Sequence, residues 1–343
     1  MGINFAGLTE PENVELSDLN GKSVAIDAYN TIYQFLSSIR QPDGRPLHDS
    51  QGRVTSHLSG ILYRTANLIE AGIEPAFVFD GDYHELKADT IKERRDRRDK
   101  AEKEWEEAIE EGDMEKAYSK AQQTSRMTPE ISSSSKELIE YLGLPIVQAP
   151  GDGEGQCAYM CTKGDVWASA SQDFDSLLFG APILVRNITI TGRRKVPGRD
   201  LYREVKTEII HLSDFLDSLG VTREQLVDMA ILMGTDFNPG IRGIGPKRGL
   251  SLIKKHGDLE SVLSYIDEEI PEYQEIRDIF LGELSTTDDY DVTVEEVDRD
   301  AVMDMLKSYD FSPVRIESAL DRIEKSRTSN KAKRSQKTLD SWF

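Results

Sequence analysis

The stretch Ser23-Val24-Ala25-Ile26-Asp27 decides the fold class, because a short apolar run with β-branched residues ends directly in a carboxylate. Such a run is typical of a strand that is buried on both faces of a parallel sheet. Similar runs precede longer helical patterns at residues 75–79, 145–147, 165–168 and 182–185. Strands that alternate with helices predict right-handed βαβ units, and so an α/β fold with a mostly parallel central sheet flanked by helices.

Acidic residues follow several of these predicted strands. Asp27 and Asp80 come directly after apolar runs, and Asp173 lies just past the run at 165–168. Ligands of such sheets bind at the carboxyl ends of the strands, so these three acids are expected to meet at one edge. Four more acids in short motifs complete the expected set: Asp152, Glu154, Asp175 and Asp236. Carboxylates are the ligands that Mg²⁺ prefers, and two-metal carboxylate sites hydrolyse phosphodiesters, so the pattern favours a nuclease.

Each acid also has a structural interpretation. Asp152 and Glu154 precede a helical pattern, where acids commonly cap a helix. Asp80-Gly81 is a common turn pair, and Asp173 could equally open a helix. The joint occurrence of acids at strand ends, rather than any single one, favours the metal site.

The composition is that of a globular protein, with 343 residues and 38% hydrophobic content. The net charge of −20 disfavours general affinity for nucleic acid, which comes from cationic side chains. The charge is uneven, because residues 325–343 hold six Lys or Arg and one Asp, a sum of +5, which leaves about −25 on the rest. We therefore expect contact with DNA through local basic patches, and an otherwise solubilising acidic surface.

Cys157 and Cys161 are the only cysteines, and without a nearby histidine we expect free or buried thiols. No eighteen apolar residues run together, and the N-terminus has no charged segment ahead of a long apolar one. These features predict a soluble intracellular protein without a membrane partner.

Between residues 87 and about 123, charged residues dominate. This predicts a solvent-exposed helix with i,i+4 ion pairs, or a segment that stands off the body and covers a substrate. Lys87 and Arg94 are seven residues apart and share a helix face, with Arg98 four residues later. Because they follow Asp80 closely, we expect them to point at the scissile phosphate and stabilise negative charge.

The segment Gly243-Ile244-Gly245 lies between two helical patterns and predicts the hairpin of a helix-hairpin-helix module. Its glycines let the backbone approach a phosphate of duplex DNA, and Lys247 and Arg248 supply charge. Plain helix capping is the structural alternative. Upstream, residues 187–206 predict a β-hairpin with turn signals at 191–192 and 197–198 and basic residues 193–195 at its tip.

The last eighteen residues or so are polar and basic until Thr338 and predict a disordered tail. Near its end, Gln336 is followed by the apolar residues Leu339, Trp342 and Phe343. Apolar anchors in a disordered segment are typical of a docking peptide that fills a partner's groove.

Several motifs together resemble those of the archaeal and eukaryotic flap endonucleases, from Met1 to about Asp267 and again in the tail. The segments that carry the resemblance are Met1-Gly2-Ile3, Ile26-Asp27-Ala28-Tyr29, Phe79-Asp80-Gly81, Ala149-Pro150-Gly151-Asp152-Gly153-Glu154, Gln172-Asp173-Phe174-Asp175, Gly234-Thr235-Asp236-Phe237 and residues 242–248. The resemblance implies a structure-specific 5′ flap endonuclease and 5′–3′ exonuclease that leaves ligatable nicks in lagging-strand (Okazaki fragment) maturation and base excision repair.

The resemblance also implies a domain organisation. The nuclease core would span residues 1–325, with an N-terminal nuclease region at about 1–105, a helical arch at about 87–125, an internal nuclease region at about 130–217 and a helix-hairpin-helix DNA-binding region at about 218–258. Residues 326–343 would form a flexible basic tail that ends in a sliding-clamp-binding peptide at 336–343. The implied partners are branched DNA with a 5′ flap and a trimeric sliding clamp. The protein would be a monomer in the cytoplasm, associated with the nucleoid.

By position, the resemblance assigns site residues. Two Mg²⁺ ions per subunit, with Mn²⁺ as a substitute, would be held by Asp27, Asp80, Asp152, Glu154, Asp173, Asp175 and Asp236, and a monovalent cation would bind at the helix-hairpin-helix. Catalytic roles would fall to Lys87, Arg94, Asp27, Asp80 and Asp173. The DNA-binding set would be Tyr33, Arg40, Arg64, Arg98, Glu154, Gly234, Asp236, Gly243, Gly245, Lys247 and Arg248, with Tyr33 stacking on a base.

The chain departs from the family pattern around one acid. Asp152 stands where the family usually has glutamate, and Gly151 and Gly155 stand where serine and alanine are common. The side chain of Asp152 is one methylene shorter, so we expect it to act on a metal through water. Two other classes remain open: a non-catalytic DNA-structure-binding scaffold, which would not need the acids, and an RNA-cleaving enzyme, which would need neither the helix-hairpin-helix nor the docking peptide.

Overall fold

A computed structural model describes residues 2–41, 43–190, 192–195, 202–282 and 285–340. Its centre is a seven-stranded sheet with the order β1-β9-β6-β5-β2-β3-β4. Five neighbouring strands are parallel, namely β2 (Ser23–Asp27), β3 (Glu74–Phe79), β4 (Ile146–Gln148), β5 (Ala168–Ala170) and β6 (Ile183–Arg186). Next to β6, β9 (Thr207–His211) is antiparallel to β6, and the edge strand β1 (Glu12–Val14) is antiparallel to β9. The prediction of a mostly parallel sheet is confirmed.

Strand β5 begins three residues later than its predicted start. The amides of Asp165 and Val166 instead donate to the carbonyl of Met160, 3.0 Å and 3.4 Å away, and so complete the turn after a helix. The apolar side chains of this segment serve the core without belonging to the strand.

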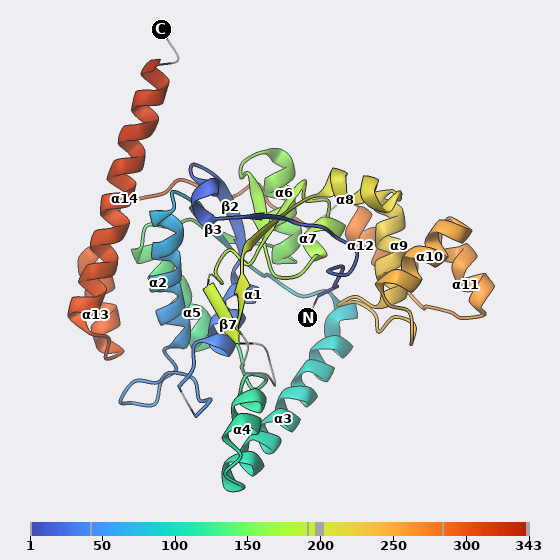
Figure 1. The fold of residues 1–343 in the computed structure, drawn as a ribbon, viewed down its shortest axis with the longest axis horizontal. Coiled ribbons are helices and arrows are strands. Elements are labelled where there is room, and N and C mark those ends of the chain that lie inside the picture. The colour runs from blue at the N-terminus through green and yellow to red at the C-terminus, as the bar shows by residue number, and fades with distance from the viewer. Residues whose placement is uncertain (1, 42, 191, 196–201, 283–284, 341–343) are drawn as a thin grey trace.

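Helices cover both faces of the sheet (Figure 1). Within β2, Val24 and Ile26 face a core formed with α1 (Ala28–Ser38), α2 (Ser56–Glu70) and α5 (Pro129–Tyr141). The same core includes residues of α13 (Arg299–Ser308) and α14 (Pro313–Asp340). Ala25 points to the opposite face and packs in a smaller core with Cys157 and Cys161 of α6 (Gly153–Lys163). Both cysteines are buried and free, as predicted.

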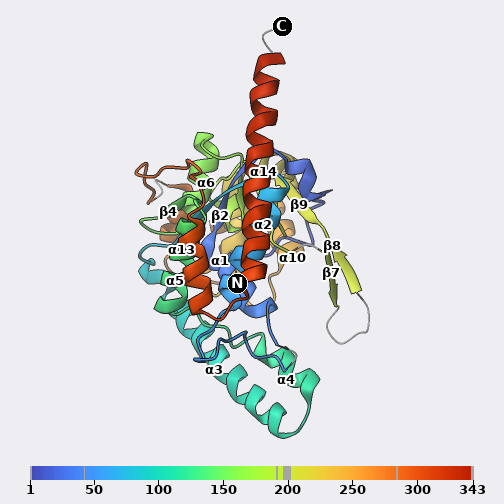
Figure 2. The same cartoon turned by 90° about the vertical axis from the view of Figure 1, so that its left-hand side faces the viewer.

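A helical hairpin projects from the body below the sheet (Figures 1 and 2). It consists of α3 (Ala88–Glu110) and α4 (Met114–Ala121), and it follows the short 3₁₀ helix η2 (Glu85–Lys87). Only alanines are buried in these two helices, Ala101 and Ala108 in α3 and Ala117 and Ala121 in α4. The predicted i,i+4 ion pairs are present, for example between Glu93 and Arg97 at 3.8 Å. The predicted exposed helix with i,i+4 ion pairs is confirmed, and the segment stands off the body, while its covering of a substrate stays a prediction.

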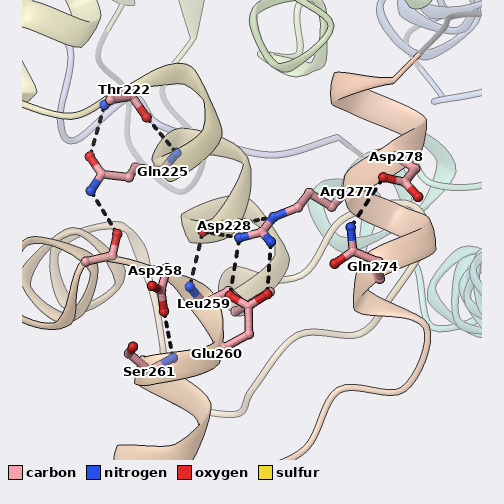
Figure 3. Close-up of polar contacts among 11 residues, drawn as sticks. Thr222, Gln225, Asp228, Asp258, Leu259, Glu260, Ser261, Gln274, Arg277 and Asp278 are labelled. Atoms are coloured by element: carbon pink, nitrogen blue, oxygen red, sulfur yellow. Dashed lines mark hydrogen bonds and ion pairs between the residues drawn. The ribbon is translucent and has the colours of Figure 1, made fainter.

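A second core packs the helical module, by which we mean α8 (Leu212–Leu219), α9 (Arg223–Met233), α10 (Pro246–His256), α11 (Leu259–Ile266) and α12 (Tyr273–Leu281). Figure 3 shows the polar contacts that join three of these helices. Asp228 of α9 accepts hydrogen bonds from Arg277 of α12, at 2.8 Å and 2.7 Å, and from the amide of Leu259 in α11 at 3.1 Å. Arg277 also donates to Glu260 at 3.0 Å, so the charges of this network are paired within the module.

The predicted β-hairpin at 187–206 is confirmed, since β7 (Gly192–Lys195) pairs antiparallel with β8 (Tyr202–Val205). Its basic residues 193–195 belong to strand β7, whereas Thr191 and the turn signal at 197–198 lie outside the described residues.

The expectation of a disordered tail is wrong for most of its length. Helix α14 continues to Asp340 and extends away from the sheet (Figure 1). No proline or glycine follows Pro313 within this helix, and its lysines, arginines and Gln336 are good helix formers, so the polar composition did not prevent a helix. In the part of the chain that the structure covers, no helix is both long enough and apolar enough to span a bilayer.

Candidate active site

Seven acids from across the chain line one cleft of about 2600 Å³. We call them the strand-edge acids, and they are Asp27, Asp80, Asp152, Glu154, Asp173, Asp175 and Asp236. Asp27, Asp80 and Asp173 meet because the parallel strands β2, β3 and β5 all end at this edge. The sequence-based expectation that these acids gather at one place is met by the geometry.

The first two acids follow neighbouring strands. Asp27 is the last residue of β2 and caps α1, since its Oδ1 accepts a hydrogen bond from the amide of Asn30 at 3.0 Å. Asp80 follows β3, and its Oδ1 accepts from the amide of Gly153 at 2.6 Å. A Cβ atom at Gly153 would lie only 2.6 Å from the same oxygen, so only glycine permits this approach. Capping and clustering are thus compatible roles.

Two acids sit at the start of helix α6. Asp152 is its N-cap and accepts from the amide of Glu154 at 3.1 Å. Glu154 accepts from the hydroxyl of Ser171 at 2.7 Å. The helix therefore carries both acids on its first turn and directs them into the cleft.

The remaining acids follow strand β5 and helix α9. Asp173 accepts from the side-chain amide of Asn30 at 3.0 Å. Asp175 opens the short helix α7 (Asp175–Leu178) and accepts from the backbone amide of Ile3 at 2.8 Å. Asp236 follows α9 and is paired with Arg94 at 2.5 Å.

Burial and mutual repulsion make several of these acids hard to ionise. Burial, and then the nearby charges of Asp80, Asp152 and Asp173, raise the pKa of Asp27 well above its usual value. Burial together with the charge of Asp175 does the same to the pKa of Glu154. Burial, and then the nearby charge of Asp152, raise the pKa of Asp80 to about 6. Burial, and then the nearby charge of Asp236, raise the pKa of Asp175 to about 8. The cleft holds more negative charge than its own cations neutralise.

Two cations from the base of the projecting hairpin reach these acids. Lys87 binds Asp152, and its ammonium lies 4.9 Å from the ring centre of Phe237. Burial alone would lower the pKa of Lys87, but the carboxylates of Asp152, Asp236 and Asp80 raise it above its usual value. Arg94 of α3 binds Asp236. Lys87 ends η2 and caps α3, whereas Arg94 lies within α3, so the two cations come from consecutive helical elements and both line the cleft.

The other residues predicted to bind DNA fall into three places. Tyr33, Arg64, Arg98 and Gly234 line the same cleft, and the guanidinium of Arg98 lies 3.4 Å from the hydroxyl of Tyr33. Arg40 is turned away, since it donates to the carbonyl of Gly44 at 2.7 Å and to Ser125 at 2.6 Å.

The predicted hairpin glycines Gly243 and Gly245 belong to the segment that joins α9 to α10, and they do not line the cleft, whereas residues 234–240 of the same segment do. Gly245 caps α10, and Lys247 and Arg248 in its first turn are exposed. Gln336 and Leu339 belong to the last turns of α14, whereas Trp342 and Phe343 lie outside the described residues.

Sequence reasoning missed several residues that orient the acids. Asn30 bonds both Asp27 and Asp173, and its position three residues after Asp27 is a capping signal that could have been recognised. Ser171 holds Glu154 and lies two residues before Asp173. The amide of Ile3 is 172 positions from Asp175, and no local pattern predicts such a contact.

Family models match two parts of the chain. Residues 1–101 match the XPG N-terminal domain, and residues 143–236 match the XPG I-region. Among solved structures, flap endonuclease-1 from Methanococcus jannaschii is 38% identical with a TM-score of 0.76, over 96% of this chain and 99% of that one. The catalytic core of Rad2 in complex with DNA substrate is 21% identical with a TM-score of 0.67, over 91% of this chain and 96% of that one, a likeness of fold alone. The fold and its acid-lined cleft define a nuclease of the XPG type.

Full-length relatives narrow the class. A flap endonuclease 1 from Aeropyrum pernix is 50% identical over 351 residues, and one from Methanococcoides burtonii is 48% identical over 344 residues, each covering 100% of both chains. The chain belongs to the flap endonuclease family.

Proposed function

We propose that the protein is a structure-specific 5′ flap endonuclease and 5′–3′ exonuclease that hydrolyses DNA phosphodiesters. The observation that carries the proposal is the convergence of the seven strand-edge acids with Lys87 and Arg94 in one cleft beneath a projecting hairpin. The names of the full-length relatives support the flap substrate. The proposed setting is lagging-strand maturation and base excision repair.

The donor set fits hard divalent cations. It consists of carboxylate oxygens, and the raised pKa values of Asp27, Asp80, Glu154 and Asp175 reflect negative charge that a cation would neutralise. As the side chains lie, no three His, Cys, Asp or Glu among the described residues are arranged to hold one ion. Lys87 and Arg94 engage two of the acids, and backbone amides orient others, so binding of cations requires small side-chain shifts.

In the proposed mechanism the strand-edge acids would hold two Mg²⁺ ions, with Mn²⁺ as a substitute. When bound, the ions supply Lewis-acid activation of the attacking water and neutralise charge on the phosphate. Lys87 and Arg94 exchange Asp152 and Asp236 for the scissile phosphate and stabilise its negative charge in the transition state. The side chain of Asp152 is short, so we propose that it acts through water. The products are a 5′-phosphate and a 3′-hydroxyl, which a ligase can join.

Further contacts would position the substrate. Tyr33 is proposed to stack on the base beside the cut, while Arg64 and Arg98 contact the strand in the cleft. The exposed pair Lys247 and Arg248, next to the hairpin glycines, would bind the backbone of the duplex, with a monovalent cation at the hairpin. Arg40 would have to leave Ser125 to reach DNA, so its role is proposed to be indirect.

The test is cleavage of a 5′-labelled double-flap DNA with Mg²⁺, compared with EDTA and with a single strand of equal length. We expect a metal-dependent cut near the flap junction and little cleavage of the single strand. Tight binding of the flap without any cut would refute the enzyme and favour the scaffold alternative. Equal cleavage of an RNA single strand would favour the RNA-cleaving alternative.

A second proposal concerns the C-terminal residues 336–343, which would bind a trimeric sliding clamp while the nuclease itself is a monomer. Removal of these residues should abolish stimulation by the clamp and leave basal cleavage unchanged, because residues 336–340 form the end of α14, which extends away from the sheet (Figure 1). A matched protein with Gln336, Leu339, Trp342 and Phe343 replaced by alanine should behave in the same way. Equal stimulation of the truncated protein would refute the docking role.

A further inference from the structure

Residues 285–298, which we call the strap, follow the helical module in the sequence and contact helix α6. Gln156 of α6 is fully buried, and its side chain bonds the strap twice. Its Nε2 donates to the carbonyl of Thr287 at 3.0 Å, and the amide of Thr287 donates to its Oε1 at 2.9 Å. A buried side-chain amide that is satisfied at both ends by one backbone residue holds that backbone in a fixed position.

The strap has other anchors along α6 and beyond it. The hydroxyl of Tyr290 donates to Asp165 at 2.5 Å, just after α6, and Tyr290 and Val292 pack on the core that contains Cys157. Ser285 reaches the turn before α6, where a Cβ atom at Gly151 would lie 3.4 Å from the Cβ of Ser285. The amide of Glu295 donates to the carbonyl of Gly143 at 2.9 Å.

The first turn of α6 needs such support. It carries Asp152 and Glu154, but glycines stand at 151, 153 and 155, and a glycine in a helix costs about 1 kcal/mol relative to alanine. Gly153 cannot be replaced, because a Cβ atom there would collide with Asp80. Gly155 has room, since its Cβ atom would lie 3.6 Å from Phe179 and 3.8 Å from the Cβ of Asp152. The turn that bears two strand-edge acids is therefore intrinsically weak, and Gln156 is the next residue.

The strap also links two parts of the site. It follows α12, whose Phe280 packs on Phe237 beside Asp236, with ring centres 5.4 Å apart. Its other contacts are to the helix of Asp152 and Glu154. We infer that Gln156, through the strap, is a positioning residue that holds the glycine-rich first turn of α6 so that Asp152 and Glu154 can bind a divalent cation. This inference rests on the proposed metal-dependent function.

The test replaces Gln156 by methionine, which has a similar volume and neither hydrogen bond. Mn²⁺ binding to the full-length protein is followed by electron paramagnetic resonance, and flap cleavage is measured against Mg²⁺ concentration. Loss of residues that orient ligands typically lowers metal affinity or activity about 10- to 100-fold. We expect Q156M to bind Mn²⁺ about tenfold more weakly, to need more Mg²⁺ for half-maximal cleavage, and to bind flap DNA in EDTA within about twofold of the original protein.

Two variants separate positioning from general stability. Tyr290→Phe removes a strap anchor remote from the acids and should leave Mn²⁺ affinity unchanged. Gly155→Ala added to Q156M should restore most of the affinity, because the extra methyl stiffens the same turn in space that can hold it. Because the added alanine favours the helix, Mn²⁺ affinity can be measured on the double variant even if Q156M alone folds poorly.

The inference is overturned if Q156M matches Y290F in Mn²⁺ affinity, or if G155A restores the melting temperature without restoring Mn²⁺ affinity. Its failure is distinct from failure of the proposed function. Original protein that binds Mn²⁺ yet leaves the flap uncut refutes the proposed function alone, because the inference is judged on Mn²⁺ affinity. Original protein that binds no Mn²⁺ overturns both.

Discussion

The strand-edge acids and the acid network of the helical module both include buried carboxylates, Asp27 and Asp175 in the first and Asp228 in the second, yet the two groups are neutralised in opposite ways. Asp228 is 1% exposed and receives a two-pronged contact from Arg277 and the amide of Leu259 (Figure 3). The seven strand-edge acids share only Lys87 and Arg94 as cationic partners within the described residues. A buried acid that is paired inside the protein supports the fold, whereas a group of acids short of cations is prepared for a ligand.

The largest expected effect comes from neutralising one strand-edge acid, which tests whether these acids serve catalysis. Asp173→Asn keeps the size of the side chain and its contact with Asn30, and it removes a charge that we assign to the metal site. We expect flap cleavage to fall at least about 10⁴-fold, or about 5 kcal/mol in barrier, with flap binding in EDTA within a few-fold. Single-turnover kinetics measure the first quantity and fluorescence anisotropy the second.

The exposed Asp304 on α13 provides the control, since Asp304→Asn should leave both quantities unchanged. Near-normal turnover by D173N would remove the two-metal assignment and, with it, the contrast between the two groups of acids.

The paired network should respond in stability instead of activity. Asp228→Asn leaves Arg277 without its buried counter-charge, and breaking such a pair costs about 3 kcal/mol. Glu260→Gln alters the half-exposed member of the same network and should cost less than about 1 kcal/mol. Urea denaturation measures both. Equal losses in the free energy of unfolding would mean that burial does not determine how much these contacts stabilise the fold. Reduced cleavage per folded molecule of D228N would mean that the network also serves catalysis.

Arg94 and Arg277 allow a direct test of the same difference, because each binds a carboxylate. The side chain of Arg94 is 36% exposed and that of Arg277 is 19% exposed. We expect Arg94→Met to slow cleavage about 100-fold while the free energy of unfolding changes by less than about 1 kcal/mol. Arg95→Met on the exposed neighbouring position is the control. A stability loss as large as that of D228N would show that Arg94 is structural.

His57 supplies the smallest test, since it is a buried ionisable group with no charged partner. It is 1% exposed, its Nε2 lies 2.8 Å from the hydroxyl of Ser134, and burial lowers its pKa to about 4. The folded state therefore keeps His57 neutral, and its contribution to stability is present above pH 6.5 and is lost as the pH falls towards 4. Between pH 7 and pH 5 the loss should be about 2 kcal/mol.

Denaturation of His57→Gln should lack this part of the pH dependence, because glutamine retains a polar end for Ser134 and does not titrate in this range. The exposed His48→Gln is the control and should keep the dependence of the original protein. Parallel curves for H57Q and the original protein would show that His57 is not the group responsible.

How far the sequence predicts this molecule depends on the range of the interactions involved. Apolar runs that end in acids predicted β2 and β3 and the meeting of the strand-edge acids, because burial on both faces leaves a local pattern. The edge strand β1 and its antiparallel neighbour β9 were not predicted, since they are short and of mixed polarity.

Contacts between a side chain and a distant backbone left no pattern at all. The strap is polar and irregular in sequence, and its bonds to Gln156 join residues 131 positions apart. The prediction for the tail was wrong because its polar composition suggested disorder, whereas the absence of helix breakers allowed α14 to continue.

The contact between Ile3 and Asp175 has a consequence for the moment at which the enzyme can first act. The two residues are 172 positions apart, and synthesis at roughly 5–20 residues per second separates their emergence by on the order of ten to thirty seconds. Asp236 emerges later still. A nascent chain therefore lacks a complete set of strand-edge acids until Asp236 has emerged, so a product that ends before residue 236 cannot form the proposed metal site.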